Sequence, residues 1–479
     1  MKPTIMKFGG TSVEGATAFK NAAGIVFDRQ GLRPVVVVSA MAGFTDALIG
    51  SVQQALTVDA AAGANSLEKH FDRHLRVIAA LLDREAARMR ELIDQSRLEI
   101  RELLAAAAAE VGGAKANESR ERRKFFEDAV VSYGERLSAA LLAAVLIENQ
   151  VRCTDVDARR CIVTDDNHGC ATPLMTDTVR NTREQLDALI ASGCIPVLGG
   201  FIGSTPVGAT TTLGRGGSDY TAALIGAALE AKEIQIWTDV QGVLTADPRL
   251  VATARTVPHL SFEEAAELAY FGAKVLHPKT LHPAIERDIP VRICNSRAQE
   301  GGSTLVVGES KKSSQTVKAI AHKTGVTTVQ VTSTRMLGAY GFLRALFEVF
   351  AEHKTAVDVV TTSEVSVSLS LDDTTSLSEI VAELEKLGSV NIEEKRAIIC
   401  VVGEGLRTTP GIAARIFSTI SDINVSLISQ GASRINLTFA VEEERVRETV
   451  ARLHKEFFES SESEDALREQ KDLSAEVSA

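Results

Sequence analysis

The stretch at residues 212–229, TLGRGGSDYTAALIGAAL, places three glycines around one arginine and follows them with a run of helix-forming residues. Ser218 is a natural N-cap, because its hydroxyl can accept a hydrogen bond from a free amide at the start of the helix. The glycines let the backbone approach an anion closely, and a helix N-terminus carries partial positive charge that suits a phosphate. Arg215 adds a planar fork for a carboxylate or phosphate. An ordinary glycine-rich turn before a core helix has the same composition, so the rest of the chain must decide between the two interpretations.

Length and composition indicate an ordinary soluble protein with more than one domain. The chain has 479 residues, enough for two or three domains, and its apolar fraction of 45% and charged fraction of 24% are typical of globular proteins. The net charge of −11, without a concentrated basic patch, argues against a nucleic-acid partner. We find no apolar run approaching the ~20 residues that span a membrane, and the N-terminus resembles a strand more than a signal peptide. We therefore expect a cytoplasmic protein without a membrane partner.

Cysteines and histidines give no sign of a metal site. The six cysteines are scattered without CxxC spacing, which is typical of reduced thiols in a cytosolic protein. His277 and His282 each precede a proline and have no carboxylate at ligand spacing, so we interpret them as loop residues.

Two apolar segments near the N-terminus each end in a loop of small residues. Residues 4–8 are expected to form a buried strand that ends at two glycines, and residues 35–38 a central parallel strand that ends in a loop containing Ser39 and Thr45. Ligands of open α/β sheets bind at the carboxyl ends of such strands, so the two loops should share one crevice. Thr45 could equally be only the cap of the following helix.

Lys7 stands at the end of the first of these strands, beside Gly9 and Gly10. Its compact ammonium and the glycine amides would suit the terminal phosphate of a nucleotide, although no Walker motif is present. On local evidence Lys7 could also be a strand-edge charge that discourages aggregation.

The middle of the chain is helical and then alternates between strands and helices. Residues 51–150 are mostly helical by pattern, and Glu135 precedes an apolar helix, where it could receive a substrate ammonium or simply favour the helix dipole from the first turn. A hairpin is expected before the glycine-rich turn. The strand at residues 234–237 ends at Thr238 and Asp239, and the loop after it suits ribose and adenine recognition.

In chain order, motifs of the N-terminal part resemble those of the aspartokinases: KFGGTSV (7–13), SAMAGFTD, YGERLSA, GRGGSDYTA, TDVQGVLTADPR and FGAKVLHP. Other amino-acid kinases share the sheet and the glycine turns, but this combination is specific to the aspartokinase branch. The resemblance implies an α/β amino-acid-kinase fold over residues 1–308, a three-layer sandwich with a mostly parallel central sheet. It also implies transfer of the ATP γ-phosphoryl group to the side-chain carboxylate of L-aspartate, which gives 4-phospho-L-aspartate. A carboxylate nucleophile is already ionised at neutral pH, so no general base is needed.

The resemblance assigns roles to matching positions of this sequence. The catalytic positions are Lys7, Gly9, Gly10 and Asp219. The aspartate pocket would comprise Ser39, Thr45, Glu135, Arg215 and Ser218. The nucleotide positions are Lys7, Gly10, Thr238, Asp239, Leu244, Arg249, Lys274 and Val275. The family commonly has a tyrosine where Leu244 stands. Mg²⁺ would arrive with ATP, without a protein metal site of its own.

Beyond a polar linker at residues 308–316 the chain repeats one pattern of a helix followed by two strands, at 341–371 and again at 411–439. The two βαββ units resemble a tandem pair of ferredoxin-like α+β ACT domains, the effector-binding modules of aspartokinases. The expected boundaries are 333–394 for the first domain and 317–332 plus 395–458 for the second. Residues 459–479 are charged and serine-rich, which is typical of a disordered tail. A homodimer through the ACT domains is implied, although such a pair can also be a purely structural dimerisation domain.

The first βαββ unit resembles the ACT domain of lysine-inhibited aspartokinases. The matching effector positions are Met336, Ala339, Gly341, Phe342, Leu343, Val357, Asp358, Ser363 and Glu364. Two carboxylates near an apolar rim favour lysine over threonine as the effector, whereas Gly338 and Ala339 stand where the lysine-sensitive pattern usually has polar side chains. The alternative function is a non-catalytic amino-acid sensor with a kinase-like fold, and intact Lys7, Arg215 and Asp219 argue against it. A bifunctional fusion with homoserine dehydrogenase is not expected, because the chain ends before a dinucleotide-binding domain.

Overall fold

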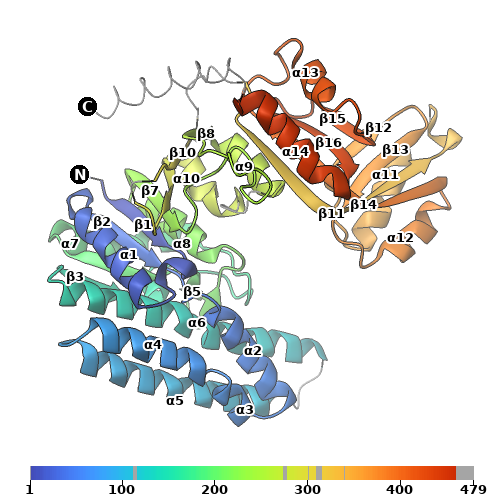
Figure 1. Ribbon diagram of the computed structural model, residues 1–479. Coiled ribbons are helices and arrows are strands. Elements are labelled where there is room, and N and C mark those ends of the chain that lie inside the picture. The colour runs from blue at the N-terminus through green and yellow to red at the C-terminus, as the bar shows by residue number, and fades with distance from the viewer. Residues whose placement is uncertain are drawn as a thin grey trace. The chain divides into compact units, whose positions relative to one another are not determined.

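The computed structural model describes residues 2–111, 116–272, 278–299, 301–308, 316–338 and 340–459. The chain divides into two compact units (Figure 1). The first comprises residues 1–243, 258–262 and 275–309, and the second comprises 244–257, 263–274 and 310–479. The second unit therefore includes two short segments that lie within the kinase-like part of the sequence. Each unit is built around a sheet of its own.

The sheet of the first unit has the strand order β3-β4-β2-β1-β7-β9-β10-β8. Neighbouring strands are parallel except for the antiparallel pair β9 and β10, so the predicted mostly parallel sheet is confirmed. Every residue of β1, β2 and β4 is buried, as expected for central strands covered on both faces. The strands are β1 (Thr4–Phe8), β2 (Pro34–Val38), β3 (Cys153–Val156), β4 (Ile195–Gly199), β7 (Glu233–Thr238), β8 (His259–Ser261), β9 (Val291–Asn295) and β10 (Thr304–Val307).

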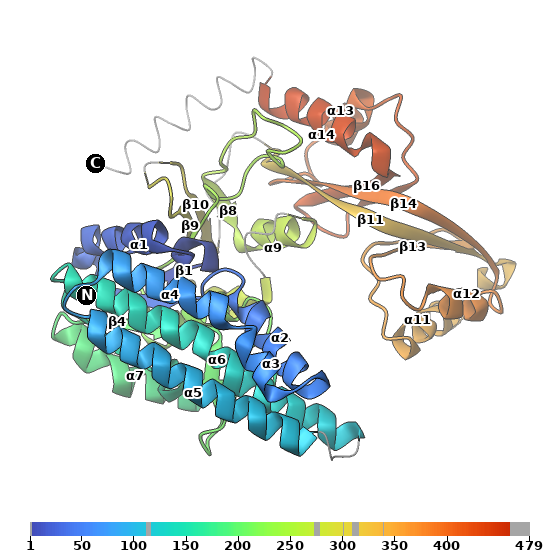
Figure 2. The same cartoon turned by 60° about the horizontal axis from the view of Figure 1, so that its bottom comes forward.

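Helices cover both faces of this sheet, so the sheet is the middle layer of the predicted three-layer sandwich. Met6 and Val36 pack into a core that α1 and α6 share with the helices outside them, and α4, α5 and α6 lie side by side in Figure 2. On the other face α8 lies so close that a Cβ on Gly226 would be 2.8 Å from Ile234. The helices are α1 (Ala16–Asp28), α2 (Phe44–Thr57), α3 (Ala60–Asn65), α4 (Glu68–Leu81), α5 (Ala86–Val111), α6 (Ala116–Glu148), α7 (Met175–Ala191), α8 (Gly217–Ala228) and α10 (His282–Glu286).

Short elements complete the first unit. The expected hairpin before the glycine-rich turn is present as β5 (Ile202–Ser204) and β6 (Thr210–Thr212). Single 3₁₀ turns are η1 (Gly10–Val13), η2 (Gln30–Leu32), η3 (Ala158–Arg160) and η4 (Pro278–Leu281).

Helix α6 differs from the sequence expectation in two ways. It runs without a break through Glu135, so this residue lies in the middle of a long helix and the prediction of a first-turn glutamate was wrong. The expectation that no apolar run is long enough to span a membrane was also wrong, because residues Ser119–Glu148 are long and apolar enough by length and composition. The apolar window of this helix is 89% buried inside the protein, as in the core helix of a soluble protein.

The second unit contains an antiparallel sheet with the order β12-β13-β11-β14-β16-β15. Its two central strands, β11 (Ala319–Thr332) and β14 (Ser389–Val402), pair along their whole length with register shifts between Lys323 and Thr328. One core lies around Leu346 and Leu369, and another around Ile416 and Phe439. The outer strands are β12 (Val360–Thr362), β13 (Ser366–Leu371), β15 (Leu427–Gln430) and β16 (Asn436–Glu442).

The helices of this unit follow the repeated pattern of the sequence. They are α9 (Phe262–Tyr270, all but its first residue), α11 (Phe342–Glu352), α12 (Leu377–Leu384), α13 (Ile412–Thr419) and α14 (Val446–His454). The 3₁₀ turns are η5 (Thr334–Met336) and η6 (Glu443–Arg445), and the π-helical turn η7 (Lys455–Glu459) is the last described element. A disordered tail was expected at 459–479, but Glu459 ends η7 and lies 3.0 Å from His454 Nδ1, so the expectation was wrong for this residue. Residues 460–479 lie outside the described residues.

Candidate active site

Lys7 and Asp219, which are 212 positions apart in the chain, form an ion pair at the centre of the first unit. Lys7 Nζ lies 2.7 Å from Asp219 Oδ1, and the two side chains are only 11% and 15% exposed. Lys7 comes from the carboxyl end of β1 and Asp219 from the first turn of α8. A Cβ on Gly9 would lie 3.6 Å from Lys7 Nζ, so the glycine backbone passes directly beside the ammonium. The ion pair is therefore a nearly buried polar group at the carboxyl ends of the strands, where ligands of α/β sheets bind.

The glycine-rich turn begins α8 in a way that the sequence did not predict. The N-cap is Gly216, whose φ of +72° is in the left-handed region that favours glycine, and no side chain caps the helix. Ser218 is the second helical residue, so its prediction as the N-cap was wrong. Ser218 instead packs against the end of β4, where a Cβ on Gly200 would lie 2.7 Å from the Ser218 Cβ. Arg215 is exposed at the tip of this turn.

Glu135 brings a buried carboxylate to the loop after β2. Its Oε1 accepts a hydrogen bond of 3.2 Å from the Ala40 amide, and its Oε2 is buried without a hydrogen-bond partner among the described residues. Burial raises the pKa of Glu135 to about 8, because the Ala40 amide offsets only part of the desolvation. The backbone of Gly199 lies against this side chain, since a Cβ there would be 2.9 Å from the Glu135 Cβ. An oxygen without a partner in such a place is available to a donor on a ligand.

The loops after β1 and β2 are joined where the sequence predicted a shared crevice. The Ser39 amide donates to the Phe8 carbonyl at 3.0 Å, and a Cβ on Gly10 would lie 2.9 Å from the Ala40 carbonyl oxygen. Thr45 is the second residue of α2, whose N-cap is Gly43 with φ of +77°. Thr45 is therefore not the cap of this helix, so the alternative interpretation of Thr45 as only a helix cap was wrong.

Thr238 is the last residue of β7, the strand that lies next to β1, and Asp239 follows it. The Thr238 hydroxyl donates to Asp239 Oδ1 at 3.2 Å, and the Thr238 carbonyl accepts a hydrogen bond of 2.8 Å from the Ser296 amide. Ser12 connects the same loops, because its Oγ lies 2.7 Å from Ser296 Oγ and 3.2 Å from the Trp237 carbonyl oxygen. Sequence analysis missed Ser12 and Ser296, although Ser12 stands inside the KFGGTSV motif.

Of the remaining nucleotide positions, Leu244 and Arg249 belong to the second unit. Leu244 forms an isolated β-bridge with Thr256. Arg249 is 86% exposed and holds the Asp247 carboxylate with two nitrogens, at 3.0 Å for Nε to Oδ1 and 2.6 Å for the terminal nitrogen to Oδ2. This pairing lowers the pKa of Asp247. Lys274 and Val275 lie outside the described residues.

The effector positions also lie in the second unit, around the start of α11. Gly341 is the N-cap of α11 with φ of +85°. Met336, Phe342 and Val357 pack on the core around Leu346 and Leu369. Leu343 and Glu364 are exposed, and the Ser363 hydroxyl lies 2.7 Å from that of Ser366. Ala339 lies outside the described residues.

Asp358 is the centre of a polar network that sequence analysis missed. Lys323 Nζ lies 3.0 Å from Asp358 Oδ2 and also contacts Asp372, and the Tyr270 hydroxyl donates to the other Asp358 oxygen. Lys323 also lies over the Tyr270 ring, 4.8 Å from its centroid. Burial, together with the neighbouring Asp372, raises the pKa of Asp358 to about 7.

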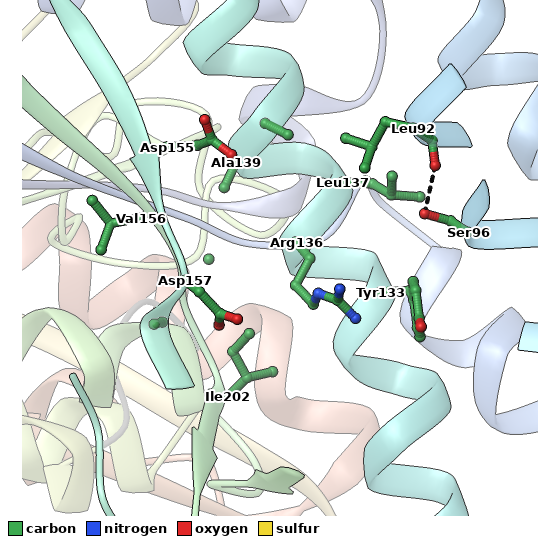
Figure 3. A pocket seen from close by; sticks show the side chains of 13 residues that line it. Leu92, Ser96, Tyr133, Arg136, Leu137, Ala139, Asp155, Val156, Asp157 and Ile202 are labelled. Atoms are coloured by element: carbon green, nitrogen blue, oxygen red, sulfur yellow. Dashed lines mark hydrogen bonds between the residues drawn. The ribbon is translucent and has the colours of Figure 1, made fainter. Parts of the chain in front are cut away.

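A polar cavity of about 160 Å³ lies between α5, α6 and β3 (Figure 3). Arg136 projects into it between Tyr133 and Asp157, with its guanidinium carbon 4.3 Å from the centre of the Tyr133 ring. Tyr133 donates a hydrogen bond of 2.5 Å to Glu99, and Asp157 is held by two nitrogens of Arg159. Because these charged groups are already partnered within the protein, we assign this cavity no part in the chemistry.

Within the described ranges, no group of three His, Cys, Asp or Glu side chains gathers as a metal site would require. The polar groups at the strand ends are one ammonium, a few carboxylates and glycine amides. Such a set can bind an anionic phosphate and an amino acid together, with any divalent cation bound mainly through phosphate oxygens.

Comparisons with known proteins agree with this arrangement. Residues 2–295 match the amino acid kinase family, and residues 399–457 match the ACT domain. The chain is 37% identical to lysine-sensitive aspartokinase 3 of Escherichia coli (strain K12), over 95% of this chain and 99% of that protein. It is also 37% identical to aspartokinase 1, chloroplastic, of Arabidopsis thaliana, over 97% of this chain and 81% of that protein.

Two solved structures of E. coli aspartokinase III are similar to the whole chain. The complex with aspartate and ADP (R-state) has a TM-score of 0.78 at 36% identity and covers 95% of this chain and 100% of that one. The complex with lysine and aspartate (T-state) has a TM-score of 0.79 at 36% identity, over 96% and 100% of the two chains.

Proposed function

This chain belongs to the aspartokinase family, and from that premise we propose that it transfers the γ-phosphoryl group of ATP to the side-chain carboxylate of L-aspartate, giving 4-phospho-L-aspartate. The observation that carries the proposal is the Lys7–Asp219 ion pair at the carboxyl end of β1. On the same side of the sheet, the unpartnered oxygen of Glu135 is available to an ammonium. A cation for phosphate and an anion for ammonium are what this pair of substrates requires.

The reaction needs charge stabilisation more than proton transfer. The attacking carboxylate has an ordinary pKa near ~3.9 and is ionised at neutral pH. Lys7 and the backbone amide at Gly10 bind oxygens of the transferred phosphoryl group, where negative charge spreads in the transition state. The Gly9 amide was expected to bind them too, but it donates to the Trp237 carbonyl at 3.0 Å, so that expectation was wrong. Asp219 orients the Lys7 ammonium. Mg²⁺ carried by the nucleotide would neutralise phosphate charge.

The aspartate pocket that we propose binds the two ends of the amino acid with opposite charges. Arg215 binds the substrate α-carboxylate through its planar fork, and Glu135 binds the ammonium. The hydroxyls of Ser39, Thr45 and Ser218 complete the pocket, and the small size of Gly199 and Gly200 lets Glu135 and Ser218 pack closely against the end of β4.

The nucleotide contacts proposed are those of Thr238, Asp239, Leu244, Arg249, Lys274 and Val275, together with Lys7 and Gly10. The position of Thr238 at the end of the strand beside β1, with Asp239 directly after it, supports this assignment. At Leu244 an apolar side chain would contact the base where the family commonly has a tyrosine.

We further propose that lysine bound at the first ACT domain inhibits the enzyme. The effector would contact Met336, Ala339, Gly341, Phe342, Leu343, Val357, Asp358, Ser363 and Glu364. The half-buried carboxylate of Asp358, already paired with the Lys323 ammonium, supports a site for a second lysine-like ammonium. Domain boundaries at 1–308, 333–394 and 317–332 plus 395–458 complete the proposal.

The protein is proposed to work in the cytoplasm as a homodimer formed through its ACT domains. Exposed apolar side chains on the second unit support an interface there: Leu337 is 64% exposed and Ile428 is 47% exposed. Light scattering of the purified protein measures the assembly, and a monomeric mass at micromolar concentration would contradict it.

A coupled ADP-release assay tests the catalytic proposal. ADP release should require L-aspartate and Mg²⁺, should fail with Lys7→Met, and should fall when lysine is added at millimolar concentration. If aspartate stimulates no ADP release, the chain is an amino-acid sensor with a kinase-like fold. If lysine binds but leaves the velocity unchanged, only the regulatory proposal is wrong.

A further inference from the structure

Asp128 is a buried carboxylate on α6 to which the proposed chemistry gives no part. The residue is 2% exposed, and it accepts hydrogen bonds from three different groups. The Thr212 hydroxyl donates to Oδ1 at 2.5 Å, the Gly169 amide to Oδ2 at 3.0 Å, and His168 Nδ1 lies 2.8 Å from Oδ2. Burying a carboxylate costs free energy unless hydrogen-bond donors replace the water. The three donors therefore stabilise the buried Asp128 carboxylate and are held in place by it.

The groups that Asp128 holds lie immediately beside the glycine-rich turn. Thr212 is the last residue of β6, and the Ala171 amide donates to its carbonyl at 2.8 Å. A Cβ on Gly214, whose φ is +75°, would lie 3.2 Å from Cys170 Sγ. The loop at residues 167–171 therefore packs directly on the residue before Arg215.

Arg215 has no anchor of its own in the structure. It is exposed, and none of the described carboxylates lies within ion-pair distance of its guanidinium. Its location is therefore set by the backbone turn around it, and that turn is held from one side by Thr212 and the loop at 167–171.

The same helix also carries Glu135. Asp128 and Glu135 are seven residues apart, which is two helical turns, so they lie on one face about 10.5 Å apart along the axis. One rigid element thus holds the residue proposed for the substrate ammonium and, through Asp128, the turn proposed for the substrate carboxylate.

We propose that Asp128 is a positioning residue that fixes the Arg215 turn relative to Glu135 and thereby sets the spacing between the two charged ends of the amino-acid pocket. This proposal rests on the proposed function of Arg215 and Glu135. It places the contribution of Asp128 in aspartate binding, because among the described residues its hydrogen bonds go to His168, Gly169 and Thr212, whereas Lys7 pairs with Asp219.

Matched variants at Thr212 test the proposal in the full chain. Thr212→Val removes the hydroxyl at nearly constant shape, and Thr212→Ser keeps it. We expect the KM for aspartate to rise about tenfold in Thr212→Val, the scale of one lost hydrogen bond to a charged group, with kcat and the KM for ATP within twofold of wild type. Thr212→Ser should restore the aspartate KM, a split that general destabilisation would not produce.

A second pair of variants keeps the test decisive if Thr212→Val does not fold. His168→Asn can retain a donor to Asp128, whereas His168→Leu cannot. The leucine variant should raise the aspartate KM and speed hydrogen exchange at residues 213–217, and the asparagine variant should do neither. An aspartate KM that is unchanged in the folded valine and leucine variants, or an equal rise in the KM for ATP, overturns the proposal. Wild-type protein that releases no ADP with aspartate would instead overturn the proposed function on which it rests.

Discussion

Glu135 gives the sharpest prediction, because burial moves its titration into the range where enzymes are assayed. With a pKa of about 8, its carboxyl is ionised in about one tenth of the molecules at pH 7 and in one half at pH 8. Only the ionised form attracts the aspartate ammonium. We therefore expect kcat/KM for aspartate to rise about fivefold from pH 7 to pH 8, while kcat/KM for ATP changes little.

The same group makes stability depend on pH in the opposite direction. The folded pKa of about 8 exceeds the ordinary value of 4.5, so between these limits the folded protein binds more protons than the unfolded chain. The stabilising contribution is full below pH 4.5 and is lost as pH rises toward 8, by up to about 5 kcal/mol. Urea titrations at pH 5 and pH 8 measure this difference.

Glu135→Gln should remove both effects. Its unfolding free energy should lose most of the pH dependence between pH 5 and pH 8, and its kcat/KM for aspartate should be low and flat over pH 7 to 8. Glu121→Gln is the matched control, because Glu121 is an exposed glutamate on the same helix and should leave both profiles unchanged. Equal slopes in wild type and Glu135→Gln would refute the reasoning.

Other variants test other parts of the two units. Lys7→Met should lower kcat about 10³-fold in the ADP-release assay, because it removes the cation from the developing phosphoryl charge, and a loss under tenfold would contradict its role. Gly200→Ala places a Cβ 2.7 Å from that of Ser218, so denaturant titration should show a loss of about 1–3 kcal/mol together with a raised aspartate KM. An unchanged KM in the folded variant would argue against Ser218 in the pocket. Asp358→Asn should move the midpoint of a lysine inhibition curve at least tenfold upward with kcat within twofold, and an unmoved midpoint would exclude Asp358 from the effector site.

Local sequence patterns predicted the sheet well, because each strand is recognised from a run of only a few apolar residues. The apolar run at residues 35–38 needed only the rule that central parallel strands are buried on both faces. The pairing of Lys7 with Asp219 came from the resemblance to the aspartokinases, and it agrees with the rule that the carboxyl ends of parallel strands and the starts of the next helices share one edge.

The errors concern features in which backbone shape or tertiary packing outweighs local preference. Ser218 is a good N-cap by type, but the turn needs a left-handed residue and Gly216 fills that place. Glu135 was expected at the start of a helix, but Gly134 before it lies within α6, where a Cβ would be 2.8 Å from that of Ala40. The partners of Asp128 and Asp358 come from separate parts of the chain, so no spacing in the sequence predicts them.

The two 14-residue strands β11 and β14 run through both halves of the second unit's sheet. Each βαββ repeat therefore pairs with strands of the other through backbone hydrogen bonds, and neither repeat is an independent folding unit. A fragment ending near residue 394 would leave half of β11 as a bare sheet edge and invite aggregation. A fusion that transfers this effector module to another enzyme must therefore contain both βαββ repeats, from residue 317 through residue 458.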